Sequence, residues 1–165
     1  MQQSLARLRV PLGFLSAAIA FGLAQPSSLW WAAGLGAAVV GEILRIWAAG
    51  HLEKGREITT SGPYRFVRHP LYLGSSLLGT GFAIAAQHIV VTLLVVIYLG
   101  ATLTAAMRTE EEGLDEKFAG AYSDYRAGLV TATGRRFSWA RVGANREHRA
   151  VIGLVIAFGI LALKI

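Results

Sequence analysis

Long apolar stretches and short polar connections alternate along this 165-residue chain. A helix rises about 1.5 Å per residue and the hydrocarbon core of a bilayer is about 30 Å thick, so the second and fourth stretches are long enough to cross it. The other three are shorter, and the last is either a short span or a helix lying partly in the interface. The pattern predicts an all-α integral membrane helical bundle of about five transmembrane helices. The predicted helices are Val10 to Ala24, Leu29 to Ala49, Leu71 to Ala86, Ile89 to Met107 and Ala150 to Leu163.

Two connections between these stretches are short enough to be tight turns. Residues 25–28 join the first stretch to the second, and residues 87–88 join the third to the fourth. Pro70 stands directly before the third stretch, and proline suits the first turn of a helix because that N–H is unpaired in any case. Small residues such as Ala37 and Gly41 recur at the spacing that allows close packing between membrane helices.

Composition supports a membrane protein. Hydrophobic residues make up 54% of the chain and the mean hydropathy is +0.49, which exceeds the values of ordinary soluble domains. The length fits a single domain over residues 1–165. There is no cysteine, which excludes disulfides, thiolate metal sites and a cysteine nucleophile.

The net charge of +6 is concentrated in the connections. Arg7 and Arg9 precede the first stretch, and further basic residues fall in the loop at 50–70 and in the segment 108–149. By the positive-inside rule these three regions face the cytoplasm, so we expect a protein of the cytoplasmic (inner) membrane. These basic residues do not form a continuous stripe of the kind that binds nucleic acid. Residues 128–149 instead predict a basic linker that touches anionic headgroups before the terminal membrane helix 150–163.

The first stretch also has the layout of a signal peptide, with a basic start and an apolar middle. We interpret it as a transmembrane helix because further spans follow. Glu42 and Arg45, near the cytoplasmic end of the second stretch, are spaced to pair along one helix face. Such a pair is either structural or part of the lining of a polar cavity.

The segment Ser61 to Gly74 concentrates polar chemistry between the apolar stretches. Its sequence, SGPYRFVRHPLYLG, holds two prolines, two tyrosines, two arginines and a histidine. Pro70 disfavours helical angles at His69, so we expect largely irregular backbone that leads into a helix. In a membrane protein, such backbone is tolerated where it is buried in protein or lines a cavity. Tyr64 and Tyr72 offer aromatic surface for a flat or cationic group.

A second polar group follows the fourth stretch. Three consecutive glutamates, residues 110–112, stand where that helix leaves the bilayer. After them Leu114, Phe118, Tyr122 and Tyr125 recur at spacings of four, four and three, which is one face of a continuing helix. The glutamates are either a solvated helix face or part of a site. Because they and Ser61 to Gly74 fall on the same side of the membrane, their polar groups can meet.

Several kinds of site have no support in the sequence. No glycine-rich motif follows a predicted strand and no Walker loop is present, so a nucleotide site of those types is not expected. His51 and His69 are too far apart for a metal pair on one helix, and the nearby carboxylates form no recognisable ligand set. We therefore expect no metal centre.

The two polar motifs together resemble a known family. GPYRFVRHPLYLG, followed by Glu110-Glu111 and by the Phe118, Tyr122 and Tyr125 pattern, is similar to the isoprenylcysteine carboxyl methyltransferases, whose core is shared with phospholipid methyltransferases. The resemblance covers about residues 45–125. It implies S-adenosylmethionine bound at the cytoplasmic face, and methyl transfer to a lipophilic membrane-embedded acceptor. That acceptor is an isoprenylcysteine carboxylate-like group, a phospholipid amine or another small lipophile.

The same resemblance implies a set of cofactor-binding residues. Glu110 would accept hydrogen bonds from the cofactor, and Arg68 or His69 would face its carboxylate. Tyr64 and Tyr72 would flank the adenine or the sulfonium. The implied positions are Arg56, Glu57, Ile58, Thr59, Tyr64, Arg68, His69, Pro70, Leu71, Tyr72 and Glu110.

The acceptor side departs from the family pattern. The family has an arginine four residues before the first glutamate, where this chain has Ala106. Arg108 is two residues away, about 200° around the helix, and so cannot simply replace it. We take Arg108 and Glu111 as the candidate catalytic residues, with Glu111 or His51 as a base for an amine, thiol or phenol acceptor.

Two other functions remain open on the sequence alone. Sterol-type membrane reductases carry a similar Arg-His-Pro-x-Tyr loop and use NADPH, although they have more spans, and no arginine set for a 2′-phosphate is evident here. A non-enzymatic membrane scaffold could use the same loop as a structural plug. The sequence does not predict an oligomeric state.

Overall fold

Helices account for the regular structure of the chain, as the sequence predicts. The computed structural model describes residues 2–118, 121–130 and 133–165, with the side chains of residues 2–12 (Arg7 and Arg9 among them), 121, 123 and 126 outside the description. No strand occurs in these ranges. The elements are α1 (Gln2–Leu23), α2 (Ser28–His51), the 3-10 helix η1 (Gly62–Arg65), α3 (Pro70–Ala86), α4 (Ile89–Phe118), α5 (Ala121–Arg126), α6 (Trp139–Ala144) and α7 (His148–Ala162).

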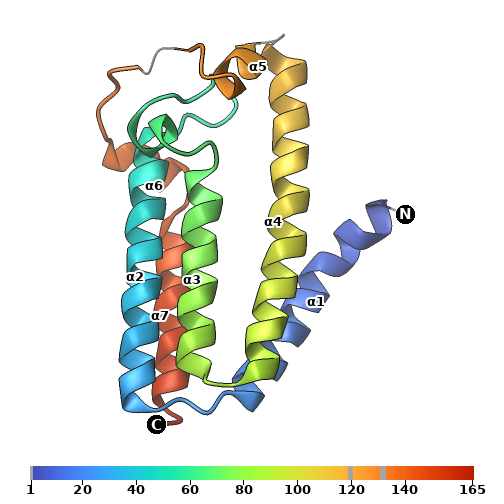
Figure 1. The fold of residues 1–165 in the computed structure, drawn as a ribbon, viewed down its shortest axis with the longest axis vertical. Coiled ribbons are helices and arrows are strands. Elements are labelled where there is room, and N and C mark those ends of the chain that lie inside the picture. The colour runs from blue at the N-terminus through green and yellow to red at the C-terminus, as the bar shows by residue number, and fades with distance from the viewer. Residues whose placement is uncertain (1, 119–120, 131–132) are drawn as a thin grey trace.

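The long helices form an elongated bundle (Figure 1). Helices α2, α3 and α7 run side by side, α4 stands away from α3 along much of its length, and α1 leans against the lower part of α4. The two predicted turns lie at one end with the C-terminus, and the loop between α2 and α3 lies at the other with α5 and α6. Helices α2 and α4 are long and apolar enough to cross a membrane. That the shorter helices α1, α3 and α7 also cross it is a prediction from the sequence.

Backbone contact between glycines holds α2 against α3. A Cβ atom at Gly34 would lie 2.4 Å from the carbonyl oxygen of Gly81. About two helical turns further along, a Cβ at Gly41 would lie 2.7 Å from the carbonyl oxygen of Gly74. Real Cβ atoms do not approach that closely, so a larger residue at either position would push the two helices apart. The predicted close packing at Gly41 is confirmed.

A buried ionic cluster joins α2 to α3 and to the start of α7. The Arg45 guanidinium donates to the Ser75 hydroxyl at 2.5 Å and to the Leu71 carbonyl at 3.4 Å, both on α3. It also pairs with Glu147, and its Nε lies 3.8 Å from a Glu42 carboxylate oxygen. Both glutamates are buried. The predicted pairing of Glu42 with Arg45 is confirmed, and its contacts are those of a structural cluster.

The segment 133–145 closes the end of α2. Side-chain donors from Arg135, Arg141 and Asn145 reach backbone carbonyls in the last turn of α2, at 3.2, 2.8 and 3.0 Å. Those carbonyls have no partner within the helix, so the bonds cap it. Arg135 also pairs with Glu57 at 2.5 Å. Arg135 and Arg141 belong to the linker predicted to contact lipid headgroups, and both bond to the protein itself.

The glycine contact predicts a difference between two alanine substitutions on α2. In Gly34→Ala, the new methyl group must push α3 away, so we expect a loss of about 1–3 kcal/mol in unfolding free energy. In the control Gly36→Ala, no atom lies within 4 Å of the added methyl group, so stability should stay the same or rise slightly. Denaturant titration of both variants in mild detergent measures the difference. Equal stabilities would contradict the proposed packing constraint.

Candidate functional site

The loop between α2 and α3 is anchored at its centre by His51. Gly62 has a φ of +59°, and a Cβ there would lie 2.5 Å from the His51 ring. The ring's Nδ1 lies 3.1 Å from the Ser61 hydroxyl. Part of this loop, predicted as irregular, forms the short helix η1, while α3 begins at Pro70 as predicted. His51 therefore holds the loop in place, and it lines neither of the two cavities described below.

Helix α4 meets this loop through Glu111. The Nε2 atom of His69 lies 2.9 Å from Oε1 of Glu111, and the Tyr122 hydroxyl donates to the same oxygen at 3.0 Å. Tyr122 belongs to α5, and residues 119–120, across which one continuous helix was predicted, lie outside the described residues. The predicted meeting of the two polar motifs is therefore seen in the structure.

A second set of bonds runs beside the first. The Tyr72 hydroxyl donates to Oε2 of Glu110 at 2.8 Å, and the Tyr125 hydroxyl donates to the backbone carbonyl of Tyr64 at 2.8 Å. Burial raises the pKa of the Tyr64 phenol, and the negative charge of Glu110 raises it further. Tyr64 is therefore a neutral hydroxyl donor at physiological pH.

A small cavity of about 50 Å³ lies between the loop and the ends of α4 and α5, and we call it the polar cavity because most of its lining residues have polar side chains. The hydroxyl oxygen of Thr59 is buried there without a hydrogen-bond partner among the described residues. An unpaired buried hydroxyl is costly, so this atom marks a place for a polar ligand. The predicted cofactor residues that line the cavity are Glu57, Ile58, Thr59, Tyr64, Arg68, His69 and Glu110.

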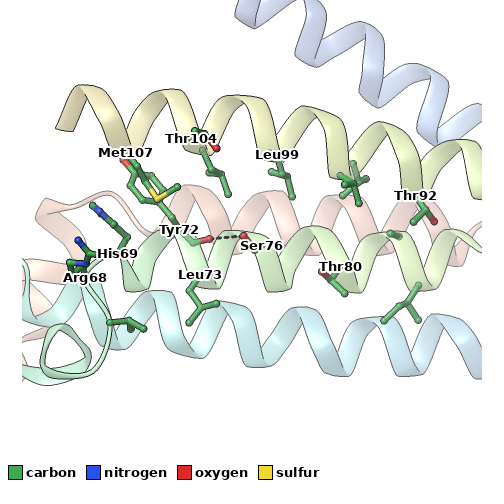
Figure 2. A pocket seen from close by; sticks show the side chains of 17 residues that line it. Arg68, His69, Tyr72, Leu73, Ser76, Thr80, Thr92, Leu99, Thr104 and Met107 are labelled. Atoms are coloured by element: carbon green, nitrogen blue, oxygen red, sulfur yellow. Dashed lines mark hydrogen bonds between the residues drawn. The ribbon is translucent and has the colours of Figure 1, made fainter. Parts of the chain in front are cut away.

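A larger apolar groove of about 710 Å³ runs between α3 and α4. Figure 2 shows Arg68 and His69 at one end of it and Thr92 toward the other, with Tyr72 and Met107 near the polar end. Arg68 and His69 line both the groove and the small cavity. The two spaces therefore meet at these two side chains.

The remaining predicted residues lie outside the small cavity. Tyr72 lines the groove, and Arg56, Pro70 and Leu71 line neither space. Arg108 is exposed on α4 and also lines neither, so the structure does not bring it into the cluster. Leu114, Tyr122 and Tyr125 line the small cavity but were not among the predicted site residues. Their helical spacing was the signal that could have placed them there.

Metal-binding side chains do not gather in this region. Within the described ranges, no group of three histidine, aspartate or glutamate residues is arranged to hold a metal ion. The site's hydrogen-bonding side chains carry hydroxyls, carboxylates, one imidazole, one guanidinium and the ammonium of Lys54. These groups suit an organic ligand with both charged and neutral polar groups.

Comparison with known proteins places the chain in a family. It is 29% identical over 120 residues to the cobalt-zinc-cadmium resistance protein CzcN of Cupriavidus metallidurans, over 67% of this chain and 54% of that protein. The chain thus spans about half the length of this relative. No solved structure matches. The family model of the phospholipid methyltransferases matches residues 16–121, which is more than half of the chain, and the protein therefore belongs to the phospholipid methyltransferase family.

Proposed function

We propose that this protein transfers a methyl group from S-adenosylmethionine to a lipophilic acceptor that lies in the membrane. One observation carries the proposal: a polar cavity and an apolar groove meet at Arg68 and His69. A methyl donor with several charged groups and an acceptor with a long apolar body need two such spaces, joined where the methyl group passes.

The small cavity suits the donor. Tyr72 occupies one carboxylate oxygen of Glu110, and the second oxygen is left to accept from a ribose hydroxyl or an ammonium group. The unpaired Thr59 hydroxyl offers a further hydrogen bond, and Arg68 supplies a positive charge for a carboxylate. When bound, S-adenosylmethionine would supply an activated methyl group on a sulfonium.

The cavity must widen before it holds such a ligand. Its volume of about 50 Å³ is well below the about 300 Å³ at which ligand pockets begin. The loop is tied to α4 and α5 by two contacts to backbone carbonyls, Lys117 Nζ to Gly55 at 2.5 Å and Tyr125 to Tyr64 at 2.8 Å. Breaking these two bonds would let residues 55–64 move away from α4, while the His69–Glu111 bond and the buried His51 anchor hold the rest of the loop.

The groove suits the acceptor. It is lined mainly by aliphatic side chains of α3 and α4, and it extends from the polar end toward the opposite end of both helices. A lipid could enter it sideways from the bilayer and place its reactive head beside Tyr72 and His69. We further propose that this polar end faces the cytoplasm, because the basic residues beside it follow the positive-inside rule.

The chain's own contribution to methyl transfer is then positioning and exclusion of water. The bonds from Tyr72 and Tyr122 hold Glu110 in the wall of the small cavity and Glu111 against His69. Fixing donor and acceptor in one geometry removes much of the entropy cost of bringing them together. The apolar walls of the groove keep water from the reacting atoms.

Binding of S-adenosylhomocysteine tests the donor site. In Glu110→Gln, a charged acceptor is lost, and we expect about a tenfold to hundredfold weaker affinity. Tyr72→Phe should weaken binding less, because it removes only the hydrogen bond that holds the Glu110 carboxylate in place. The control Glu112→Gln changes an exposed neighbour on the same helix and should bind as the unaltered protein does. Isothermal titration of the purified protein measures all four affinities.

Two results would count against this donor site. Equal affinity in Glu110→Gln and Glu112→Gln would remove Glu110 from it. If the unaltered protein bound NADPH and not S-adenosylhomocysteine, the reductase alternative would replace the methyltransferase proposal.

Filling the groove tests the acceptor site. Gly100 lines the groove, and no atom lies within 4 Å of a Cβ placed there. The ring in Gly100→Phe would therefore occupy acceptor space without displacing the protein. We expect the rate of methyl transfer into a total lipid extract to fall about tenfold or more, with unchanged affinity for S-adenosylhomocysteine. Gly36→Phe, at a glycine that is equally uncrowded but outside the groove, is the control, and equal rates in the two variants would contradict the assignment.

A further inference from the structure

His69 lies where a side chain can act on both reactants. Together with Arg68, it lines both the polar cavity and the apolar groove. Arg68 remains protonated under all ordinary conditions and so cannot accept a proton. The imidazole of His69 has a ring nitrogen with an unshared electron pair, and is therefore the side chain at the junction that can accept a proton.

The contacts of His69 define which ring nitrogen is free. Oε1 of Glu111 accepts from the Tyr122 hydroxyl at 3.0 Å, as an ionised carboxylate does. The same oxygen lies 2.9 Å from Nε2 of His69, so Nε2 carries the hydrogen. In a neutral imidazole the other nitrogen, Nδ1, then has an unshared electron pair. Within the described part of the chain, Nδ1 has no hydrogen-bond partner.

We propose that His69 is the proton acceptor for the methyl acceptor's head group, and that Glu111 positions its ring. The inference rests on the proposed function. The acceptor is then a group that must lose a proton, such as a lipid amine, and its electron pair forms the new bond to the methyl carbon. The bond from carbon to sulfur breaks with its electrons left on sulfur, and the proton of the amine passes to Nδ1 of His69.

The charges around His69 fit this role. Glu111, from α4, stabilises the imidazolium that forms, and the Tyr122 hydroxyl of α5 keeps that carboxylate in place. Glu110, paired with Tyr72 of α3, adds negative charge nearby. The positive charge of Arg68 has the opposite effect and destabilises the imidazolium. Glu111, considered above as the base itself, already binds two hydrogen-bond donors through one oxygen and is better suited to orient His69.

Nitrogen NMR tests the ring geometry without any substrate. The chain has four histidines, so labelling them with ¹⁵N gives few signals, and His69→Asn identifies the one from His69. We expect the neutral ring of His69 to carry its hydrogen on Nε2 and to leave Nδ1 unprotonated. In Glu111→Gln that preference should weaken, whereas Glu112→Gln should leave it unchanged. A ring protonated at Nδ1 in the unaltered protein would overturn the proposal.

The pH dependence of methyl transfer tests the chemistry. The probe is a vesicle made from total lipid extract, with labelled S-adenosylmethionine as the donor. A base works only when unprotonated, so the rate should fall as the pH is lowered. In His69→Asn the rate should fall by about 10²–10⁴-fold, and the acidic decline due to this group should disappear. His148→Asn, at an exposed position at the start of α7, is the control.

The outcomes separate this inference from the proposed function. If the unaltered protein binds S-adenosylhomocysteine and methylates lipid, but His69→Asn keeps its rate and pH profile, only the role of His69 is overturned. If His69→Asn raises the KM for the cofactor and leaves kcat unchanged, His69 is a cofactor contact and not the base. Absence of any S-adenosylhomocysteine binding would instead reject the proposed function, and the NMR result would still decide the geometry of the ring.

Discussion

The close contact of α2 with α3 is the constraint on which the rest of this structure depends. Two glycine pairs bring the backbones together, at Gly34 with Gly81 and at Gly41 with Gly74. Lipid tails are as apolar as most side chains, so helices in a membrane associate mainly through such close packing and through polar contacts. The Arg45 cluster adds the polar contact at the end nearest the site. Together they fix α3, the helix that carries His69 and Tyr72 at its start.

Helix α4 has a different relation to α3. Instead of glycine pairs, the two helices have an apolar groove between them, and polar bonds to Glu110 and Glu111 close its end. The groove therefore has one rigid wall, helix α3, and a second wall, helix α4, that is held mainly at its end. Under the proposed function, this arrangement keeps the reacting groups in fixed positions and leaves space for a lipophilic molecule from the side.

The parts of this fold that depend on local signals could be predicted from the sequence. Pro70 marked the start of α3, and residues 87–88 marked the turn before α4. The meeting of Glu110 and Glu111 with the loop followed from charge placement, because both were expected on one side of the membrane. The glutamates thus proved to be more than a solvated helix face.

Other features depend on contacts that no local pattern announces. Glu147 is distant in sequence from Arg45, and nothing around it signals that it joins the buried cluster. The capping of α2 by Arg141 and Asn145 was hidden in a segment whose composition indicated only contact with headgroups. The groove arises from the separation of two whole helices, which apolar periodicity does not encode. Arg108, a candidate two residues away from the family's arginine position at Ala106, lies outside both cavities.

The account's central claim is that a polar donor site and a lipid groove serve one methyl transfer. Its most direct test is to incubate the purified protein in vesicles of total lipid extract with S-adenosylmethionine labelled in its methyl group, and to identify the products by mass. The account predicts label in a lipid whose mass rises by one methyl group, and about tenfold to hundredfold less label when Glu110→Gln replaces the unaltered protein at low donor concentration. Label that stays entirely in the water-soluble fraction, in spite of measured binding of the donor, would contradict it.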